Sequence, residues 1–442
     1  MLNIMDKNEI IKILNDWNFW SKDLSVGVFR GLYLWELEKM MPSEQIKVIT
    51  GARRSGKSYI MRQLAKWLME QQGVNRKNIL FVNFEDPRFT ALSVQLLQQA
   101  FDVYLEQQQP RGKIYVFLDE VQEIPAWEKW VRTAQELNKA NLVISGSNAR
   151  LLSGELATTL TGRHLALTVL PLSFKEFLDF KGLTVNNKKD LLNNEIKLKS
   201  FLAEFSQFGS FPLVVLGAEK DRILLSYFDD LVSKDLIKRY KIRKTEEIKG
   251  LVKFYLSNIS SSITFSSAGK FLNLSAQSVE RFSAYLEASY LLFFLKRFSF
   301  KIREVEKSPR KVYAIDVGLA KAVGSQFSEN LGRTAENLVF LELKRRAFFN
   351  PRLEIYYWKN LAQEEVDFVV KEGVAVKELI QVCWDLGNLK TKQRETKALL
   401  KALTAFKLNR GLIITEDYEG EEKFGNKKIR YVTLRQWLLD LC

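Results

Sequence analysis

The sequence predicts an α/β protein whose first large domain is built on a doubly wound parallel sheet. Residues 47–58, KVITGARRSGKS, read as a strand, a glycine-bounded loop and the start of a helix. The apolar runs 79–84, 114–120 and 142–148 follow, and each of them ends in polar residues. Strands that alternate with helices and carry polar groups at their carboxyl ends are typical of this fold, so we expect the core over residues 46–172.

The loop after the first strand fits the pattern G-x-x-x-x-G-K-[ST], with Gly51, Gly56, Lys57 and Ser58 at its fixed positions. The glycines let the backbone approach a phosphate chain, and the N–H groups and the helix N-terminus then face the anion. Lys57 can reach the β- and γ-phosphates, and the Ser58 hydroxyl can ligate Mg²⁺. The alternative, a basic surface turn with a chance match, is disfavoured by the flanking strand and helix. We therefore expect ATP and Mg²⁺ as cofactors. The expected nucleotide-binding residues are Gly51, Ala52, Arg53, Arg54, Ser55, Gly56, Lys57, Ser58 and Tyr59.

The strand at residues 114–120 ends in an Asp-Glu pair after four apolar residues. Asp119 is expected to hold Mg²⁺ together with Ser58, usually through water, and Glu120 is expected to polarise the attacking water. Such a pair is a weak signal alone. It becomes a strong one about sixty residues after a phosphate loop, at the end of a strand of the parallel type.

Two further positions complete the expected catalytic set of Lys57, Glu120, Asn148 and Arg163. Ser147 or Asn148, at the end of the 142–148 strand, could sense the γ-phosphate and orient the water; a turn or a helix cap is the alternative. After an expected helix at residues 149–160, Arg163 lies in the turn before the last apolar strand. An arginine there could reach the nucleotide of a neighbouring subunit, or it could form a surface salt bridge.

The regions before and after the predicted core are expected to form separate segments. Residues 1–45 carry an aromatic cluster, Trp17, Phe19 and Trp20, which either belongs to the core or packs on an adenine or a neighbouring subunit. A helical lid is expected at 173–245, with a loop at 184–195. Residues 246–325 show the sequence pattern of a helix-turn-helix, with a turn at Asn273 and a helix N-cap at Ser275. Two strands that could form a wing follow. The loop that joins these strands is expected to carry the basic residues Lys301, Arg303, Lys307, Arg310 and Lys311.

Charge favours an anionic partner. The 442 residues include 67 Lys and Arg against 52 Asp and Glu, which gives a net charge of +15. The clustering of basic residues around the expected wing makes DNA the favoured partner, although many winged helices serve only as lids or protein contacts. The single histidine excludes a His-based triad, and two cysteines form no disulfide framework. The sequence predicts no signal peptide and no membrane span, which suits the cytoplasm.

Taken together, several segments resemble the bacterial and archaeal AAA-type ATPases that carry a C-terminal domain of unknown function. The segments are GARRSGKS, FVNFEDPRF, FLDEVQ, ISGSNARLLSGELATTLTGR, PLSFKEFL and KDLIKRY. The resemblance covers nearly the whole chain, in the same motif order. It implies an AAA+ P-loop ATPase core, a helical and winged-helix middle domain, and a C-terminal α/β domain at residues 326–442 similar to PD-(D/E)xK nucleases.

The resemblance also places nuclease-like positions in this chain. The two acids fall on Glu336 and Asp367, and the third acid and the lysine fall on Gln381 and Cys383. A metal-dependent nuclease needs carboxylates for Mg²⁺ and usually a lysine. Because Gln381 and Cys383 supply neither a carboxylate nor an amine, we expect a module that binds nucleic acid or protein without cleaving it. The neighbouring Lys377 and Glu378 leave an active nuclease as an alternative.

The expected function is therefore an oligomeric ATPase that couples hydrolysis to remodelling of DNA or movement along it. The alternatives are a nucleotide-gated switch with slow hydrolysis and an ATP-driven nuclease. A homo-oligomer, with a ring of six subunits, is an expectation carried from the wider ATPase class and from a site shared between neighbours.

Overall fold

A computed structural model describes residues 5–149, 162–324 and 330–441. The chain forms two compact units, Met1–Val169 and Leu170–Cys442, which are described separately below. The expected helix at residues 149–160 lies almost entirely outside the described residues. Within the described ranges, no helix is both long and apolar enough to cross a membrane.

The first unit contains a five-stranded sheet in the order β2-β3-β4-β1-β5, in which every neighbouring pair is parallel. Its strands are β1 (Ile46–Gly51), β2 (Ile79–Asn83), β3 (Tyr115–Asp119), β4 (Asn141–Gly146) and β5 (His164–Val169). This arrangement confirms the prediction of a parallel α/β sheet. The strand order also places the ends of β1 and β3 on either side of β4, so that residues following these strands can meet.

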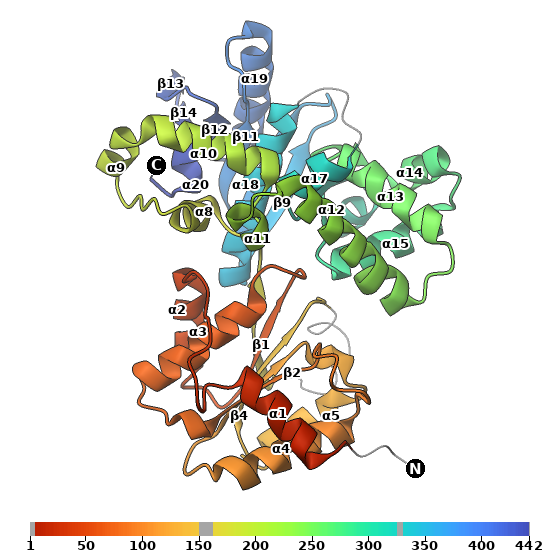
Figure 1. Ribbon diagram of the computed structural model, residues 1–442. Helices are drawn as coiled ribbons and strands as arrows, with labels where there is room; N and C mark the ends of the chain where they lie inside the picture. The colour runs from red at the N-terminus through yellow and green to blue at the C-terminus, as the bar shows by residue number, and fades with distance from the viewer. Residues whose placement is uncertain (1–4, 150–161, 325–329, 442) are drawn as a thin grey trace. The chain divides into compact units, whose positions relative to one another are not determined.

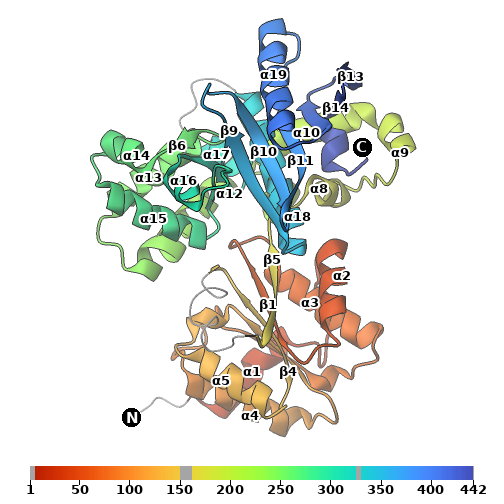
Figure 2. The same cartoon turned by 180° about the vertical axis from the view of Figure 1, so that it is seen from behind.

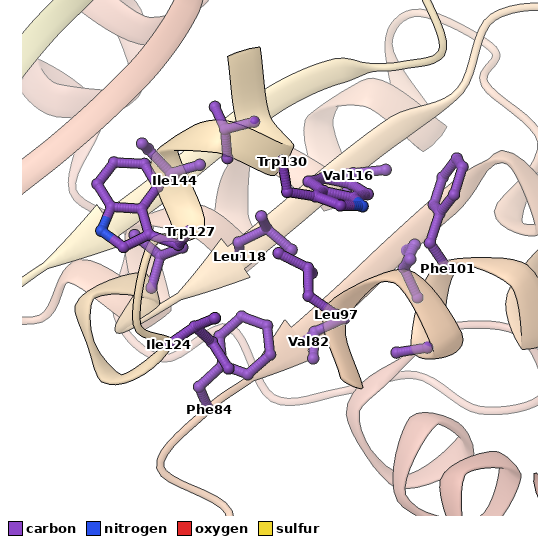
Figure 3. Packing of buried hydrophobic residues seen from close by; sticks show 14 of the residues in the cluster. Val82, Phe84, Leu97, Phe101, Val116, Leu118, Ile124, Trp127, Trp130 and Ile144 are labelled. Atoms are coloured by element: carbon purple, nitrogen blue, oxygen red, sulfur yellow. The ribbon is translucent and has the colours of Figure 1, made fainter. Parts of the chain in front are cut away.

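Helices cover both faces of this sheet (Figures 1 and 2). They are α1 (Lys7–Trp17), α2 (Gly31–Met40), α3 (Lys57–Glu70), α4 (Val94–Gln108) and α5 (Trp127–Glu136). Helices α1, α4 and α5 lie on one face, where apolar side chains from β2, β3 and β4 meet Phe101, Trp127 and Trp130 (Figure 3). Each large apolar side chain buried there contributes about 1.5–3 kcal/mol relative to an exposed one.

The aromatic cluster of the N-terminal segment belongs to this core. Phe19 is buried, the Trp17 indole N–H donates to Asp86 (2.7 Å), and that of Trp20 donates to the carbonyl of Ile79 (2.8 Å). Trp17 also stacks on Phe81 and Trp20 on Tyr104, which agrees with the core alternative.

The second unit begins with helices. They are α8 (Phe174–Phe180), α9 (Lys188–Asn193), α10 (Glu195–Phe208), α11 (Pro212–Leu216), α12 (Lys220–Asp230), a π-helix (Leu231–Lys238) and α13 (Thr245–Ser257). The loop prediction for residues 184–195 is wrong over α9. The Asn187 side chain accepts a hydrogen bond from the Asp190 N–H (2.9 Å) and so caps a short helix in an asparagine-rich stretch.

A small three-stranded antiparallel sheet follows, in the order β6-β8-β7. The elements in chain order are β6 (Ser262–Ile263), α14 (Phe265–Leu272), α15 (Ala276–Ala288), β7 (Leu292–Leu295), α16 (Ile302–Lys307) and β8 (Arg310–Ala314). The turn falls where expected, with Asn273 at φ +58° and Ser275 capping α15. The prediction of a loop that carries all five basic residues is wrong. Lys301 is the N-cap of α16, which contains Arg303 and Lys307, and Arg310 and Lys311 belong to β8, where Lys311 is buried.

The C-terminal part contains a six-stranded mixed sheet in the order β13-β14-β12-β11-β10-β9. Its elements are α17 (Val317–Val323), α18 (Leu331–Phe349), β9 (Leu353–Lys359), β10 (Glu365–Glu372), β11 (Ala375–Val382), α19 (Leu389–Ala405), β12 (Arg410–Thr415), β13 (Gly420–Phe424), β14 (Lys427–Thr433) and α20 (Leu434–Leu438). Helix α19 packs along the sheet through Leu399, Ala402 and Leu403 (Figure 2). This sheet and its helices are the second α/β region that the sequence predicts.

Candidate nucleotide site

The loop between β1 and α3 has a backbone that only glycine allows at its ends. Gly51 has a φ of +141°, and a Cβ there would lie 2.0 Å from the carbonyl oxygen of Val169. Gly56 precedes α3 at φ +100°, and no side chain caps the helix. The N–H groups of the first turn of α3 are therefore left for another acceptor, as an anion site requires.

Lys57 is buried at the start of α3. Its ammonium group donates hydrogen bonds to the carbonyls of Gly51 and Ala52, both at 3.2 Å, and lies 3.4 Å from Oε1 of Glu120. The lysine thus connects the phosphate loop with the acidic end of β3. Ser58, the next residue, is half-buried, and its hydroxyl hydrogen-bonds Asp119, a contact that opposes the rise in the pKa of that carboxyl described below.

Asp119 and Glu120 follow the buried strand β3, and Ser145 of β4 holds both of them. The Ser145 hydroxyl donates to Oδ1 of Asp119 and accepts from the Glu120 N–H (3.1 Å). Glu120 has a φ of +52°, an unusual conformation for a residue with a side chain. Ser145 was not among the residues predicted for the site. Its only signal in the sequence is a polar residue in a buried strand beside the Asp-Glu strand.

The two carboxyls differ in their electrostatics. Burial and the neighbouring Glu120 raise the pKa of Asp119 despite hydrogen bonds from Ser145 and Ser58. Burial also acts to raise the pKa of Glu120, but the positive charge of Lys57 and a hydrogen bond from Gln122 outweigh it and leave this pKa lowered. Glu120 is therefore held as a carboxylate, the form that can accept a proton.

The site has unsatisfied polar atoms that suit a nucleotide with a metal ion. Oδ2 of Asp119 and the hydroxyl of Ser55 are buried and make no hydrogen bond of ordinary geometry within the described ranges. Unpaired buried polar groups are costly. The Asp119 oxygen suits a cation such as Mg²⁺, and the Ser55 hydroxyl can donate to a phosphate oxygen. Ser58, Asp119 and the loop N–H groups together provide the donor set that the sequence predicts.

Other residues brace the loop or its neighbourhood. Arg53 pairs with Glu85, which follows β2 (2.5 Å). Arg30 is buried and donates to the carbonyl of Ser55 (2.6 Å). No pattern in the sequence points to Arg30, because it lies before β1 and outside any motif. Of the other predicted nucleotide-binding residues, Arg54 is exposed at φ +66°, and Tyr59 is 46% exposed.

The remaining predicted catalytic residues lie on two other parts of the unit. Ser147 and Asn148 are buried directly after β4, at the same edge of the sheet as Glu120. Arg163 lies before β5 with its side chain 43% exposed, and it pairs with Glu136 of α5 (2.5 Å). The structure therefore joins Lys57 to Glu120 and places Arg163 in a surface ion pair, which was the alternative interpretation of that residue.

The nuclease-like positions lie in the second unit. Asp367 and Gln381 are neighbours, since the Gln381 side-chain oxygen accepts from the Asp367 N–H (3.1 Å). Glu336 and Asp367 both contact the ammonium group of Lys311, at 2.9 and 2.8 Å. An amine is thus present after all, and β8 supplies it. Over residues 5–149, 162–324 and 330–441, no group of His, Cys, Asp and Glu side chains is arranged to hold a metal ion.

Comparisons with known proteins found family models over most of the chain and a similar solved structure. An AAA domain matches residues 43–178, and two domains of unknown function, DUF8612 and DUF4143, match residues 201–333 and 331–437. The Walker-type ATPase PABY2304 of Pyrococcus abyssi is similar in structure over 67% of this chain and 95% of its own, with a TM-score of 0.43 and 11% identity.

Two relatives match along most of their length. An uncharacterized protein of Methanocaldococcus jannaschii is 36% identical over 395 residues, which cover 87% of this chain and 85% of the relative. An uncharacterized protein of Haemophilus influenzae is 30% identical over 422 residues, which cover 93% of this chain and 99% of the relative. The chain therefore belongs to the family of these two proteins and carries the AAA-type ATPase domain followed by two domains of unknown function.

Proposed function

We propose that this protein binds and hydrolyses ATP with Mg²⁺ at the end of β1, and that the AAA domain does so as part of a homo-oligomer. The observation that carries the proposal is the convergence of Lys57 and Glu120, 3.4 Å apart, beside the open N–H groups of α3. When bound, Mg²⁺ would supply positive charge that neutralises the phosphates during hydrolysis. Ser58 and Asp119 would hold it, and the loop residues 51–59 would bind the phosphates.

Each protein group then has a role that its environment supports. Lys57 would turn from the loop carbonyls to the β- and γ-phosphates, and this would release Glu120 from its ion pair. Glu120, kept charged at neutral pH, would orient the attacking water and accept its proton. Asn148, buried at the same sheet edge, would contact the γ-phosphate and fix the direction of attack.

A direct test compares ATP binding and hydrolysis by the full chain and by Lys57→Met. We expect the variant to lose hydrolysis and to bind ATP more weakly, because an apolar side chain cannot neutralise phosphate charge. Lys66→Met on the exposed side of α3 is the matched control, and it should behave as wild type. An unchanged rate of ATP hydrolysis by Lys57→Met would refute the proposal.

The second part of the proposal is that hydrolysis acts on DNA. The net charge of +15 and the element order α13-β6-α14-α15-β7-β8 support a winged-helix contact. The exposed side chains of α15 include Gln277, Glu280 and Arg281, so this helix offers no strongly basic face. The connection between β7 and β8 exposes Arg303 and Lys307, which suits contact with phosphates rather than reading of bases.

Binding to the phosphate backbone has a measurable signature. We expect the DNA affinity of the wild-type chain to fall steeply with salt, and the slope to decrease by up to two when both Arg303 and Lys307 are changed to alanine. The paired change of Lys188 and Lys189, exposed on α9, is the matched control. Equal slopes for the two double variants would exclude this surface as the DNA contact.

The rate of hydrolysis separates a motor from a nucleotide-gated switch. The ion pair between Lys57 and Glu120 favours the switch as the second candidate, because each group must leave the other before it can act. A motor requires rapid turnover that DNA stimulates, whereas a switch requires DNA affinity that depends on the bound nucleotide while turnover stays slow. ATP hydrolysis with and without DNA distinguishes them.

A further inference from the structure

The second unit contains a buried lysine surrounded by three carboxylates. Lys311 of β8 is 3% exposed, and its ammonium nitrogen lies 2.9 Å from Glu336, 2.8 Å from Glu365 and 2.8 Å from Asp367. An ammonium group has three N–H donors, so each donor has its own carboxylate. This arrangement satisfies the lysine completely and places one positive charge at the centre of the cluster.

The carboxylates come from α18 and β10, and the lysine comes from another sheet. Lys311 lies in the central strand of the three-stranded sheet, opposite Ser262 of β6 and Leu295 of β7. On β10, the pairing with β9 shifts register between Val366 and Val369. Such a bulge re-aims side chains, which allows Asp367 to face the lysine while the flanking valines stay in the core.

The carboxylates make further contacts besides those with the lysine. Oδ2 of Asp367 accepts from the N–H of Val382 (2.9 Å), and Oε1 of Glu336, the atom that also contacts Lys311, accepts from the Tyr313 hydroxyl (2.7 Å). Oε2 of Glu365 lies 3.3 Å from Lys359. A Mg²⁺ ion requires oxygen ligands at about 2.0–2.1 Å in octahedral geometry. The centre where these carboxylates would meet is filled by the lysine.

The lysine carries its charge at neutral pH. Burial acts to lower the pKa of Lys311, but the charges of Asp367 and Glu336 outweigh this effect and raise it well above its usual range. Residues of the nuclease-like pattern are therefore present, but they do not fit the divalent metal that such nucleases need.

We propose that Lys311 is a resident cation that takes the place of a divalent metal in the Glu336, Glu365 and Asp367 cluster. The cluster thereby joins the three-stranded sheet to the six-stranded sheet and does not support metal-dependent cleavage. Cys383 stands where the nuclease pattern has a lysine, but this is only part of the departure from that pattern. The larger part is a lysine that arrives from β8 and occupies the metal position.

Manganese binding tests this proposal, with Mn²⁺ alone as the probe and electron paramagnetic resonance as the readout. We expect wild type and Asp367→Asn to bind the same number of Mn²⁺ ions. Lys311→Met should gain an additional equivalent, and the double variant with Asp367→Asn should lose it again. Lys359→Met is the matched control, because Lys359 contacts Glu365 at the rim of the cluster and should gain none.

Two results would overturn the proposal. One is a Mn²⁺ site, or Mn²⁺-dependent cutting of plasmid DNA, that wild type shows and Asp367→Asn lacks. The other is a folded Lys311→Met protein that gains no Mn²⁺. If Lys311→Met does not fold, the comparison of wild type with Asp367→Asn decides by itself: equal binding supports the resident lysine, and lost binding refutes it.

Discussion

The ammonium nitrogen of Lys57 lies 3.4 Å from a carboxylate oxygen of Glu120, and both side chains are almost completely buried. These residues belong to different motifs, and the strand order β3-β4-β1 brings them together. Removing only one partner of such a buried pair strongly destabilises the folded protein. In the proposed function these two groups act separately, Lys57 on the phosphates and Glu120 on the attacking water.

The shape of the loop predicts a strong effect of Gly51→Ala. Its methyl group would overlap the Val169 carbonyl, and its φ of +141° is unfavourable for alanine. We expect loss of folding, or a free energy of unfolding lower by more than about 3 kcal/mol. Gly73→Ala is the control, since Gly73 has φ +66° but open space, and should cost about 1 kcal/mol. Equal melting temperatures for the two variants would show that the close approach is unimportant.

The contacts of Ser145 predict that loss of its hydroxyl impairs ATP hydrolysis without impairing ATP binding. Ser145→Ala removes the hydroxyl that holds Asp119 and the Glu120 backbone. Loss of such a supporting group typically costs about 10- to 100-fold in activity. We expect kcat to fall in this range while the Kd for ATP stays unchanged. Ser93→Ala, which removes the cap of α4, should lower stability but leave kcat per folded chain unaffected. A normal kcat for Ser145→Ala would contradict the positioning role.

The proposed role of Arg163 predicts an active site that two neighbouring subunits share. If Arg163 acts on a neighbour's nucleotide, Arg163→Ala should lower hydrolysis about 10³-fold or more at concentrations that support assembly. Arg132→Ala is the matched control, because Arg132 pairs with the same Glu136 carboxylate (3.0 Å). A surface pair alone contributes at most about 1 kcal/mol of stability and leaves hydrolysis unchanged.

A mixture of two variants tests directly whether the active site is shared between subunits. Arg163→Ala keeps its own Glu120, and Glu120→Gln keeps its own Arg163. Some interfaces in a mixed oligomer would then combine an intact Glu120 with an intact Arg163, and part of the activity should return. No recovery from the mixture, together with normal hydrolysis by Arg163→Ala, would leave the residue as the surface salt bridge that the structure shows.

The raised pKa of Glu336 predicts that the stability of the folded protein depends on pH. Burial and the neighbouring Asp367 raise the pKa of Glu336 from about 4.5 to about 7, despite Lys311. The folded protein therefore holds this proton more tightly than the unfolded chain, and the free energy of unfolding falls as the pH rises from 4.5 to 7. The full effect is about 3 kcal/mol at most. Chemical denaturation at about pH 5 and about pH 8 should show a smaller decrease for Glu336→Gln than for wild type. The same decrease in both proteins would place the titration elsewhere.

The arrangement of the phosphate-loop residues and the Asp-Glu pair could be predicted from the sequence because the information is local. Gly51, Gly56 and Lys57 are adjacent in one motif, and Asp119 and Glu120 end an apolar strand. The parallel sheet then brings the motifs together, as the alternation of strands and helices implies. Ser145 and Arg30 could not be assigned in this way, because each acts on a backbone or carboxylate group from a different element.

The C-terminal cluster was harder to predict for the same reason. Glu336 and Asp367 were assigned by resemblance, but the position of Lys311 depends on how β8 pairs with β6 and β7. In the sequence, Lys311 appears as one more basic residue near a wing. The structure shows that it is buried against acidic residues, so charge pattern alone predicted the wrong environment.

The most direct measurement of the central claim is steady-state ATP hydrolysis by wild type, Glu120→Gln and the control Glu123→Gln. Glu123 lies three residues after Glu120, in the turn Val121–Glu123. The amide that Glu120→Gln introduces could not accept a proton from water. We therefore predict that Glu120→Gln binds ATP but loses about 10²-fold or more in kcat, while Glu123→Gln hydrolyses normally. Hydrolysis by Glu120→Gln at the wild-type rate would contradict the assignment of this site.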